Sequence, residues 1–281
     1  CGISYHHNEE RIDIYREDYQ KYGYTCSCGS YEIHESFYRE DGTIDKKFTV
    51  KDGNLHGKYI EFISNGNEFI QIEYNNGKYL GNSDNLHVAL MDVIDATATS
   101  FTIPITTKII YNDAFSGCNK LTSITIPDGV VNIGSYAFYK CSALANITIP
   151  SSVTSIYALA FAGCRALKSI TIPKNLSMIG LQAFDGCGAL TSIVVEEGNF
   201  MYDSRNNCNA IIKSATNTLI RGCCNTTIPE NIEEIDSYAF SGCMGLTTIA
   251  IPEGVKKIGK YAFFGCGELT NITIPDSVTS I

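Results

Sequence analysis

The sequence predicts a solenoid built from repeated coils, each with one short parallel β-strand, and a small β-rich domain before it. Each of the seven prolines follows an isoleucine, and five of the six intervals between successive prolines are 23 residues. Six Ala-Phe pairs keep the same interval, and each phenylalanine is followed three residues later by a cysteine and six residues later by a leucine. A fixed period of about 20–29 residues with leucine and cysteine at set places is the signature of leucine-rich repeats.

Each position of the strand has a physical reason. Ile124 and Ile126 alternate with Ser123 and Thr125, which puts the two pairs on opposite faces of the strand. β-Branched residues suit a pleated, half-buried surface. Pro127 then ends the ladder, because proline has no N–H to donate and holds the preceding residue extended.

The rest of the coil returns the chain to the next strand. Val130 and Ile133 carry the chain across the coil, Gly134 gives a turn, and 135–141 is spaced for one short helical turn. No repeat can bury its own apolar edge, so coils stacked at about 4.8 Å per strand bury these edges in one continuous core.

Composition limits the classes of protein that the chain can represent. It has 281 residues, of which 44% are hydrophobic and 18% charged, enough apolar material for a core and unlike a disordered chain. No apolar run approaches the roughly 18 residues that a membrane-spanning helix needs. The net charge of −9 argues against a nucleic-acid partner, because phosphate contact needs a basic surface.

Charge and histidine content change near residue 95. Residues 1–95 contain 17 acidic and nine basic side chains, whereas residues 96–281 contain 13 and 12. All five histidines lie in the first part. We therefore expect a small acidic β-rich domain over 1–95 and the solenoid over 96–281.

The block LTSITIPDGVVNIGSYAFYKC has near-copies over most of residues 101–281. It resembles the BspA-like leucine-rich-repeat family of the Treponema pallidum type. The resemblance implies a curved, right-handed solenoid on a cell-surface or secreted protein that binds other macromolecules. Members of this family occur in oral and gut bacteria and in some parasitic protists.

One repeat departs from the period. The interval between Pro173 and Pro229 is 56 residues, and Glu196 stands where the intermediate proline would fall. We expect an irregular repeat at about 196–228 that carries a projecting hairpin. Its two strands are expected at 209–213 and 218–221. Insertions of this kind often contact partners, although a tolerated surface insertion explains the sequence as well.

Residues 48–81 hold a looser repeat. Gly53 and Gly77, and likewise Gly57 and Gly81, are 24 residues apart. Between them, aromatic or β-branched residues alternate with polar ones around Asn-Gly pairs, which favour type I′ hairpins. This segment resembles a MORN-type repeat region, and we expect hairpins there.

Twelve cysteines raise the question of disulfides, but six of them recur at the same point of the repeat. Stacked in register, their Cβ atoms would lie about 4.8 Å apart and parallel, whereas a disulfide prefers about 3.8 Å and converging bonds. We expect buried free thiols that act as small hydrophobic residues with weak donors. This cysteine ladder comprises Cys118, Cys141, Cys164, Cys187, Cys243 and Cys266. A bridge from Cys208 to Cys223 or Cys224 stays open for a secreted protein.

No catalytic residue, cofactor or metal is predicted. The solenoid has no histidine to act as a general base, and it lacks the G-x-S-x-G, Walker and H-E-x-x-H motifs. Cys26 and Cys28, with His6, His7 and His34, imitate a zinc site, but no second CxxC or HxxxH pair completes the spacing.

The ends of the sequence bear on anchoring. A mature bacterial lipoprotein begins with a lipidated cysteine, and Cys1-Gly2 fits that pattern. Alternatively, the sequence simply starts there within a longer chain. It stops at Ile281 in the middle of a repeat, so we expect the chain to continue.

The outward side chains of the strands form two columns that are small, polar and neutral. We expect them to form a concave ligand-binding ladder: Ser123, Thr125, Asn146, Thr148, Ser169, Thr171, Asn271 and Thr273. Such a face suits an extended protein or glycan held by many weak contacts. The alternative is that parallel threonine columns only stabilise the sheet through side-chain hydrogen bonds.

Three functions remain open at this level. The first is a non-enzymatic, monomeric adhesion module, either secreted or anchored by an N-terminal lipid in the outer membrane. It would bind a protein or glycoprotein of a host or neighbouring cell. The second is a structural spacer that displays the N-terminal domain. The third is an enzyme whose catalytic part lies in 1–95 or outside this sequence.

Overall fold

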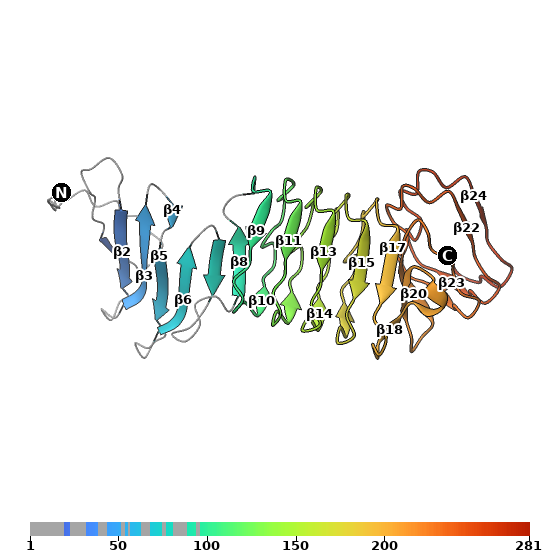
Figure 1. Ribbon diagram of the computed structural model, residues 1–281, viewed down its shortest axis with the longest axis horizontal. Coiled ribbons are helices and arrows are strands. Elements are labelled where there is room, and N and C mark those ends of the chain that lie inside the picture. Colours follow the sequence, from blue (N-terminus) through green and yellow to red (C-terminus); the bar gives the residue numbers. More distant parts are fainter. Residues whose placement is uncertain are drawn as a thin grey trace. The chain divides into compact units, whose positions relative to one another are not determined.

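The computed structural model describes the strand backbones between Gln20 and Val93 and all of residues 96–281, and it describes side chains for Leu90 and for 96–281 (Figure 1). The chain divides into two compact units, Cys1–Ile94 and Asp95–Ile281.

The first unit is an antiparallel meander, which confirms its expected β-rich character. Its neighbouring strands are, in spatial order, β1 (Gln20–Tyr22), β2 (Glu32–Tyr38), β3 (Ile44–Lys51), β5 (Gly57–Phe62), β6 (Glu68–Tyr74), β7 (Gly77–Leu80) and β8 (Ala89–Val93). The short β4 (Asn54–Leu55) pairs with β3. The Asn-Gly turns expected in this unit lie partly outside the described residues, and the MORN-type resemblance stays a prediction.

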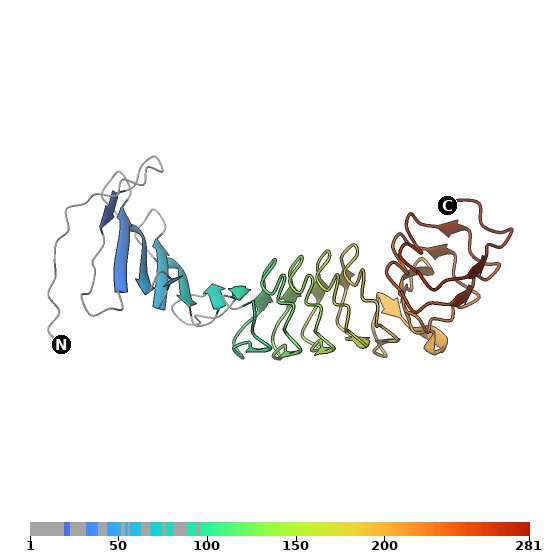
Figure 2. The same cartoon turned by 90° about the horizontal axis from the view of Figure 1, so that it is seen from above.

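The second unit is the predicted solenoid, whose coils stack one after another along the chain (Figures 1 and 2). The predicted strands pair in parallel with partners 23 residues away, as Ser123 does with Asn146. They form three groups: β9 (Ser100–Thr102), β11 (Ser123–Thr125) and β13 (Asn146–Thr148); β15 (Ser169–Ile172) and β17 (Ser192–Val195); β22 (Thr248–Ala250) and β24 (Asn271–Thr273). We call this set of strands the first ladder.

Most coils also contribute a second, two-residue strand, which the sequence analysis did not predict. These strands form a second parallel ladder: β10 (Ile109–Ile110), β12 (Asn132–Ile133), β14 (Ser155–Ile156) and β16 (Met178–Ile179), and further along β21 (Glu234–Ile235) and β23 (Lys257–Ile258). The only signal for them was an isoleucine at a fixed place in the coil, as at Ile133 and Ile156. A two-residue strand is too short to show periodicity of its own.

The expected short helical turn at 135–141 is wrong, because hydrogen-bonded turns take its place. The N–H of Cys141 donates to the Phe138 carbonyl at 3.2 Å, but the N–H of Phe138 donates to Ala160 in the next coil at 2.7 Å. An α-helix needs its N–H groups for bonds within the segment, and here alternate groups are committed to the neighbouring coil. Among the described residues the only helix is the 3-10 helix η1 (Arg205–Asn207).

These turns require a left-handed residue immediately before the ladder cysteine. Lys140 has a φ of 57°, and the equivalent residue in the other coils is a glycine with φ between 66° and 77°. A left-handed backbone costs a residue with a Cβ atom about 1 kcal/mol. This cost favours the glycine that five of the six coils carry before the cysteine.

Stacked aromatic rings fill the core. The rings of Phe115, Phe138, Phe161 and Phe184 lie nearly parallel, with centroids 4.9, 5.1 and 5.4 Å apart. All four side chains are buried. The leucine six residues after each repeat phenylalanine is likewise buried in the coils from Leu121 to Leu246. The repeated apolar positions therefore form one column for each residue type.

The irregular repeat begins where a proline is missing. The N–H of Glu196 donates to the Ile172 carbonyl at 2.9 Å, a bond that proline could not make. The first ladder is therefore one residue longer here, and Ile172 pairs with Val195.

The expected hairpin is present, but it does not project. Strands β19 (Ala210–Lys213) and β20 (Thr218–Gly222) are antiparallel, and β18 (Tyr202–Asp203) pairs with β19. Ala210, Ile211, Ile212 and Leu219 are buried. Strand β20 also pairs in parallel with β21 of the next coil. The hairpin thus packs its apolar side chains into the solenoid core, where they are shielded from water.

Replacing Phe161 by alanine is expected to lower the free energy of unfolding by about 3–5 kcal/mol, because the cavity lies between two stacked rings. Urea unfolding followed by circular dichroism measures this change. Phe200→Ala is the matched control, since that side chain is 95% exposed and its removal should change the free energy little. Equal effects of the two substitutions would contradict this view of the core.

Candidate binding face

The residues predicted to bind a ligand lie on the outward side of the first ladder. In β11 and β13 the outer residues of each strand are exposed and the central isoleucine is buried. The structure brings Ser123, Thr125, Asn146 and Thr148 together in one sheet. Ser169 and Thr171 lie in a second sheet.

Asn271 and Thr273, both exposed, lie in a third sheet. Between this sheet and the second one stands the irregular repeat. The eight residues are therefore not one continuous array, although each pair occupies the same place in its coil. We call these eight residues the ladder face.

The side chains of the ladder face make no hydrogen bond within the described solenoid. Side-chain bonds between coils come instead from neighbouring positions, as when Thr122 and Thr191 donate to the carbonyls of Thr99 and Lys168 at 3.1 and 3.3 Å. The alternative explanation, in which threonine columns stabilise the sheet, thus applies to those positions and not to the ladder face. Its hydroxyl and amide groups are open to a ligand.

A groove interrupts the first ladder before β22. Residues 224–228 form no strand, because they bond to the irregular repeat instead. The Thr227 N–H donates to the backbone carbonyl of Cys208 at 3.1 Å, and the Thr226 hydroxyl donates to the backbone carbonyl of Asn209 at 2.6 Å. Within the described residues β22 has a strand partner only in β24. The groove has a volume of about 320 Å³ and is lined by Thr227, Thr248 and Glu230 among others. Sequence reasoning missed it, since residues 225–229 keep the repeat pattern of the other strands.

An ion pair fixes the end of the hairpin. Arg205 donates to both carboxylate oxygens of Asp203, from Nε at 2.7 Å and from Nη2 at 2.6 Å. The Ser214 hydroxyl adds a bond of 2.6 Å to the same carboxylate. Burial opposes the charge of Asp203, but these hydrogen bonds outweigh it and hold the pKa of Asp203 below its usual value. The turn at 214–217 is therefore clamped to β18.

The cysteine ladder lies inside the solenoid. The thiols donate to backbone carbonyls of the preceding coil, as Cys141 does to Phe115 at 3.1 Å and Cys164 to Phe138 at 3.2 Å. Cys187, Cys243 and Cys266 make the same kind of contact, and Cys118 is also buried. Burial raises the pKa of Cys141 to about 12. A thiol of this kind is not a nucleophile at neutral pH.

The cysteines of the irregular repeat also contact carbonyl groups. The Cys223 thiol donates to the backbone carbonyl of Asn209 at 3.4 Å, and the Cys208 thiol lies 4.0 Å from the Ala210 carbonyl. Cys224 is half-buried and contacts Gly188.

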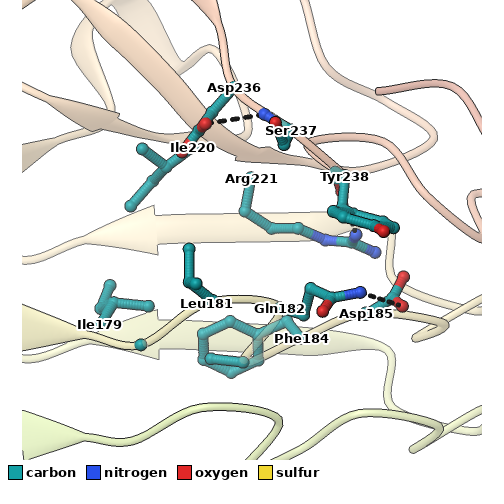
Figure 3. A pocket seen from close by; sticks show the side chains of 12 residues that line it. Ile179, Leu181, Gln182, Phe184, Asp185, Ile220, Arg221, Asp236, Ser237 and Tyr238 are labelled. Atoms are coloured by element: carbon teal, nitrogen blue, oxygen red, sulfur yellow. Dashed lines mark hydrogen bonds between the residues drawn. The ribbon is translucent and has the colours of Figure 1, made fainter. Parts of the chain in front are cut away.

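A small cavity lies between the turn after β16, strand β20 and the residues that follow β21. Figure 3 shows the Arg221 guanidinium reaching between Tyr238 on one side and the hydrogen-bonded pair of Gln182 and Asp185 on the other. The cavity has a volume of about 80 Å³. Sequence reasoning did not single out Arg221, because an arginine in a strand is usually a surface residue.

Some predicted site residues lie outside the described side chains. Cys1, Cys26, Cys28, His6 and His7 lie outside the described residues. His34 lies on β2, of which only the backbone is described. Among the described side chains, no group of three or more His, Cys, Asp or Glu residues could hold a metal. The described part of the chain also holds no helix long and apolar enough to cross a membrane.

Comparison with known proteins agrees with this geometry. The family described as the BspA type leucine rich repeat region matches residues 95–212 and 219–281 in six copies. No curated protein matches the chain.

Several solved structures are similar to this chain. A leucine rich cell surface protein from Faecalibacterium prausnitzii is 24% identical, with 75% of this chain and 76% of that chain covered and a TM-score of 0.52. The Treponema pallidum leucine rich repeat protein is 25% identical over 73% and 83%, with a TM-score of 0.46. The pneumococcal vaccine antigen PcpA is 19% identical over 79% and 72%, with a TM-score of 0.55.

The buried thiols predict how stability depends on pH. Burial raises the pKa of Cys141 and of Cys243 from 9.0 to about 12. Below pH 9 these thiols are protonated in both the folded and the unfolded state; above it only the unfolded state loses the protons. The free energy of unfolding should therefore fall between about pH 9 and 12, by up to about 1.4 kcal/mol per thiol and pH unit.

Urea unfolding at pH 8, 9 and 10 under reducing conditions measures this slope. The matched variant Cys141→Ala/Cys243→Ala should show a shallower slope, since lysines and tyrosines titrate equally in both proteins. Identical slopes would show that these thiols do not govern the alkaline loss of stability.

Proposed function

Because the chain belongs to the BspA-type leucine-rich repeat family, we propose that it is a non-catalytic module that binds a macromolecular partner on its ladder face. The partner is a protein or glycoprotein of a host or neighbouring cell. The observation that carries the proposal is the ladder face itself, a set of exposed hydroxyl and amide groups that make no hydrogen bond within the described solenoid.

The chemistry of the ladder face favours a neutral, extended partner. Its side chains carry no charge, and they recur at the strand spacing of about 4.8 Å. Such a surface offers hydrogen bonds at regular intervals and no large aromatic anchor, so each contact is weak. Binding through it should depend little on ionic strength, because salt screens charges and the face has none.

A place on the cell surface fits this function. The Faecalibacterium protein with the same fold is described as a cell surface protein. Cys1, which lies outside the described residues, would provide the lipid anchor if it is the mature N-terminus. A surface protein present in many copies gains avidity, which compensates for weak single contacts.

Replacing Thr148 and Thr171 with lysine should weaken partner binding at least about tenfold, because two ammonium groups would lose water on contact without gaining a counter-ion. Binding to a glycan array and to a panel of extracellular glycoproteins is the measurement. Both positions are exposed, so thermal unfolding should be unchanged.

The control adds the same charge elsewhere, as Asn119→Lys and Gly267→Lys. These exposed residues occupy the same place in their coils as Arg165, so a cation is tolerated there. If the double lysine variant of the ladder face binds as well as this control, the ladder face is not the site.

A further inference from the structure

Arg221, a buried cation that forms no ion pair with a described residue, lies at the cavity of Figure 3. The Arg221 side chain is 5% exposed, and Nη1 donates to the carbonyls of Tyr238 and Ser241 at 3.3 and 3.0 Å. Nη2 lies 3.8 Å from the thiol of Cys243. These acceptors are all neutral, and no ion pair of the described residues includes Arg221. A guanidinium in this position is costly unless an anion reaches it.

The same cavity holds a buried carboxylate oxygen without a donor. Oδ2 of Asp185 accepts from Gln182 at 3.4 Å, whereas Oδ1 is buried and has no partner. Nε of Arg221 is likewise buried and has no partner. The described part of the chain has three buried side-chain polar atoms without a partner. Two of them, Oδ1 of Asp185 and Nε of Arg221, belong to residues that line this one cavity. Native proteins rarely leave such atoms unpaired.

The two free atoms require opposite chemistry. Nε–H and one N–H of Nη2 lie on the same edge of a guanidinium, the fork that a carboxylate binds with two hydrogen bonds. Oδ1 of Asp185 needs a donor, and Asp236, whose carboxylate accepts from the Ser237 N–H at 2.7 Å, adds negative charge to the lining. An anion alone would satisfy Arg221 only, and an amine alone would satisfy Asp185 only.

Volume limits what can enter. A cavity of about 80 Å³ corresponds to the liquid volume of roughly three water molecules, which is also the size of the smallest α-amino acids. Phe184 and Ile220 line it as well, beside the polar residues Gln182, Ser237 and Tyr238. We propose that this cavity binds a free α-amino acid of the size of glycine, with its carboxylate on Arg221 and its ammonium group towards Asp185. This site is independent of the ladder face.

The test uses the full chain, labelled with 15N, and glycine as the probe. Buried arginine Nε–H groups give separate resonances, and the Arg221→Lys variant identifies the one that belongs to Arg221. Glycine should shift this resonance saturably and raise the Tm. Acetate and ethylamine, which each carry one half of glycine, should not saturate the shift over the same range of concentration.

Asp185→Asn tests the ammonium contact. The side chain is half-buried at a turn, so the fold should persist, and the affinity for glycine should fall about tenfold or more with the loss of a charged acceptor. Asp128→Asn, at an exposed turn, is the matched control and should leave the affinity unchanged.

Three results would overturn the proposal. If glycine causes no saturable shift, the cavity holds water only. If acetate binds as tightly as glycine, the site is a simple anion site. If Asp185→Asn binds glycine as well as the unchanged protein does, no ammonium contact exists.

Discussion

Hydrogen bonds between equivalent positions of neighbouring coils are the interaction on which the rest of the solenoid depends. The N–H groups of Phe115, Phe138 and Phe161 each donate to an alanine carbonyl of the next coil at 2.7 Å. A coil alone would leave these groups unpaired and its phenylalanine exposed, so neither the backbone nor the core is complete without a neighbour. Because these bonds fix the offset at 23 residues, each position becomes a column of similar side chains. Phenylalanine and cysteine columns fall inside, and the ladder face falls outside.

The groove and the Arg221 cavity lie where this regularity is broken, whereas the ladder face lies on the regular coils. Residues 224–228 bond to the irregular repeat instead of continuing the first ladder, and the groove beside β22 is the result. In the same repeat β20 enters the second ladder and carries Arg221 into the interior. The side chains that the regular coils bury are mostly apolar ones and thiols, with hydroxyl groups at Thr107 and Ser241. The irregular repeat, which makes the interval from Pro173 to Pro229 ten residues longer than two regular repeats, therefore introduces a buried charged side chain that the regular coils lack.

The period of the sequence was sufficient to predict the strands of the first ladder and the stacked core, because both depend on side chains that recur at fixed positions. The turns at 135–141 could not be predicted, since their N–H groups are divided between the segment and the next coil, and local spacing looks helical. The hairpin was predicted from its own strands, but its burial depends on β21, which lies beyond it in sequence. Arg221 and Asp185 gave no signal, because an unpaired polar atom is a property of the packed structure alone.

The break at 224–228 also limits the partner that the ladder face can hold. Before the break the residues of the ladder face lie on three strands, β11, β13 and β15, which at about 4.8 Å per strand span roughly 10 Å. An extended polypeptide crossing these strands would meet the face with about three residues. So small a contact, made of neutral hydrogen bonds, is weak for a single molecule. Strong attachment through this face then requires many copies on one surface, or a partner that continues across the groove to Asn271 and Thr273.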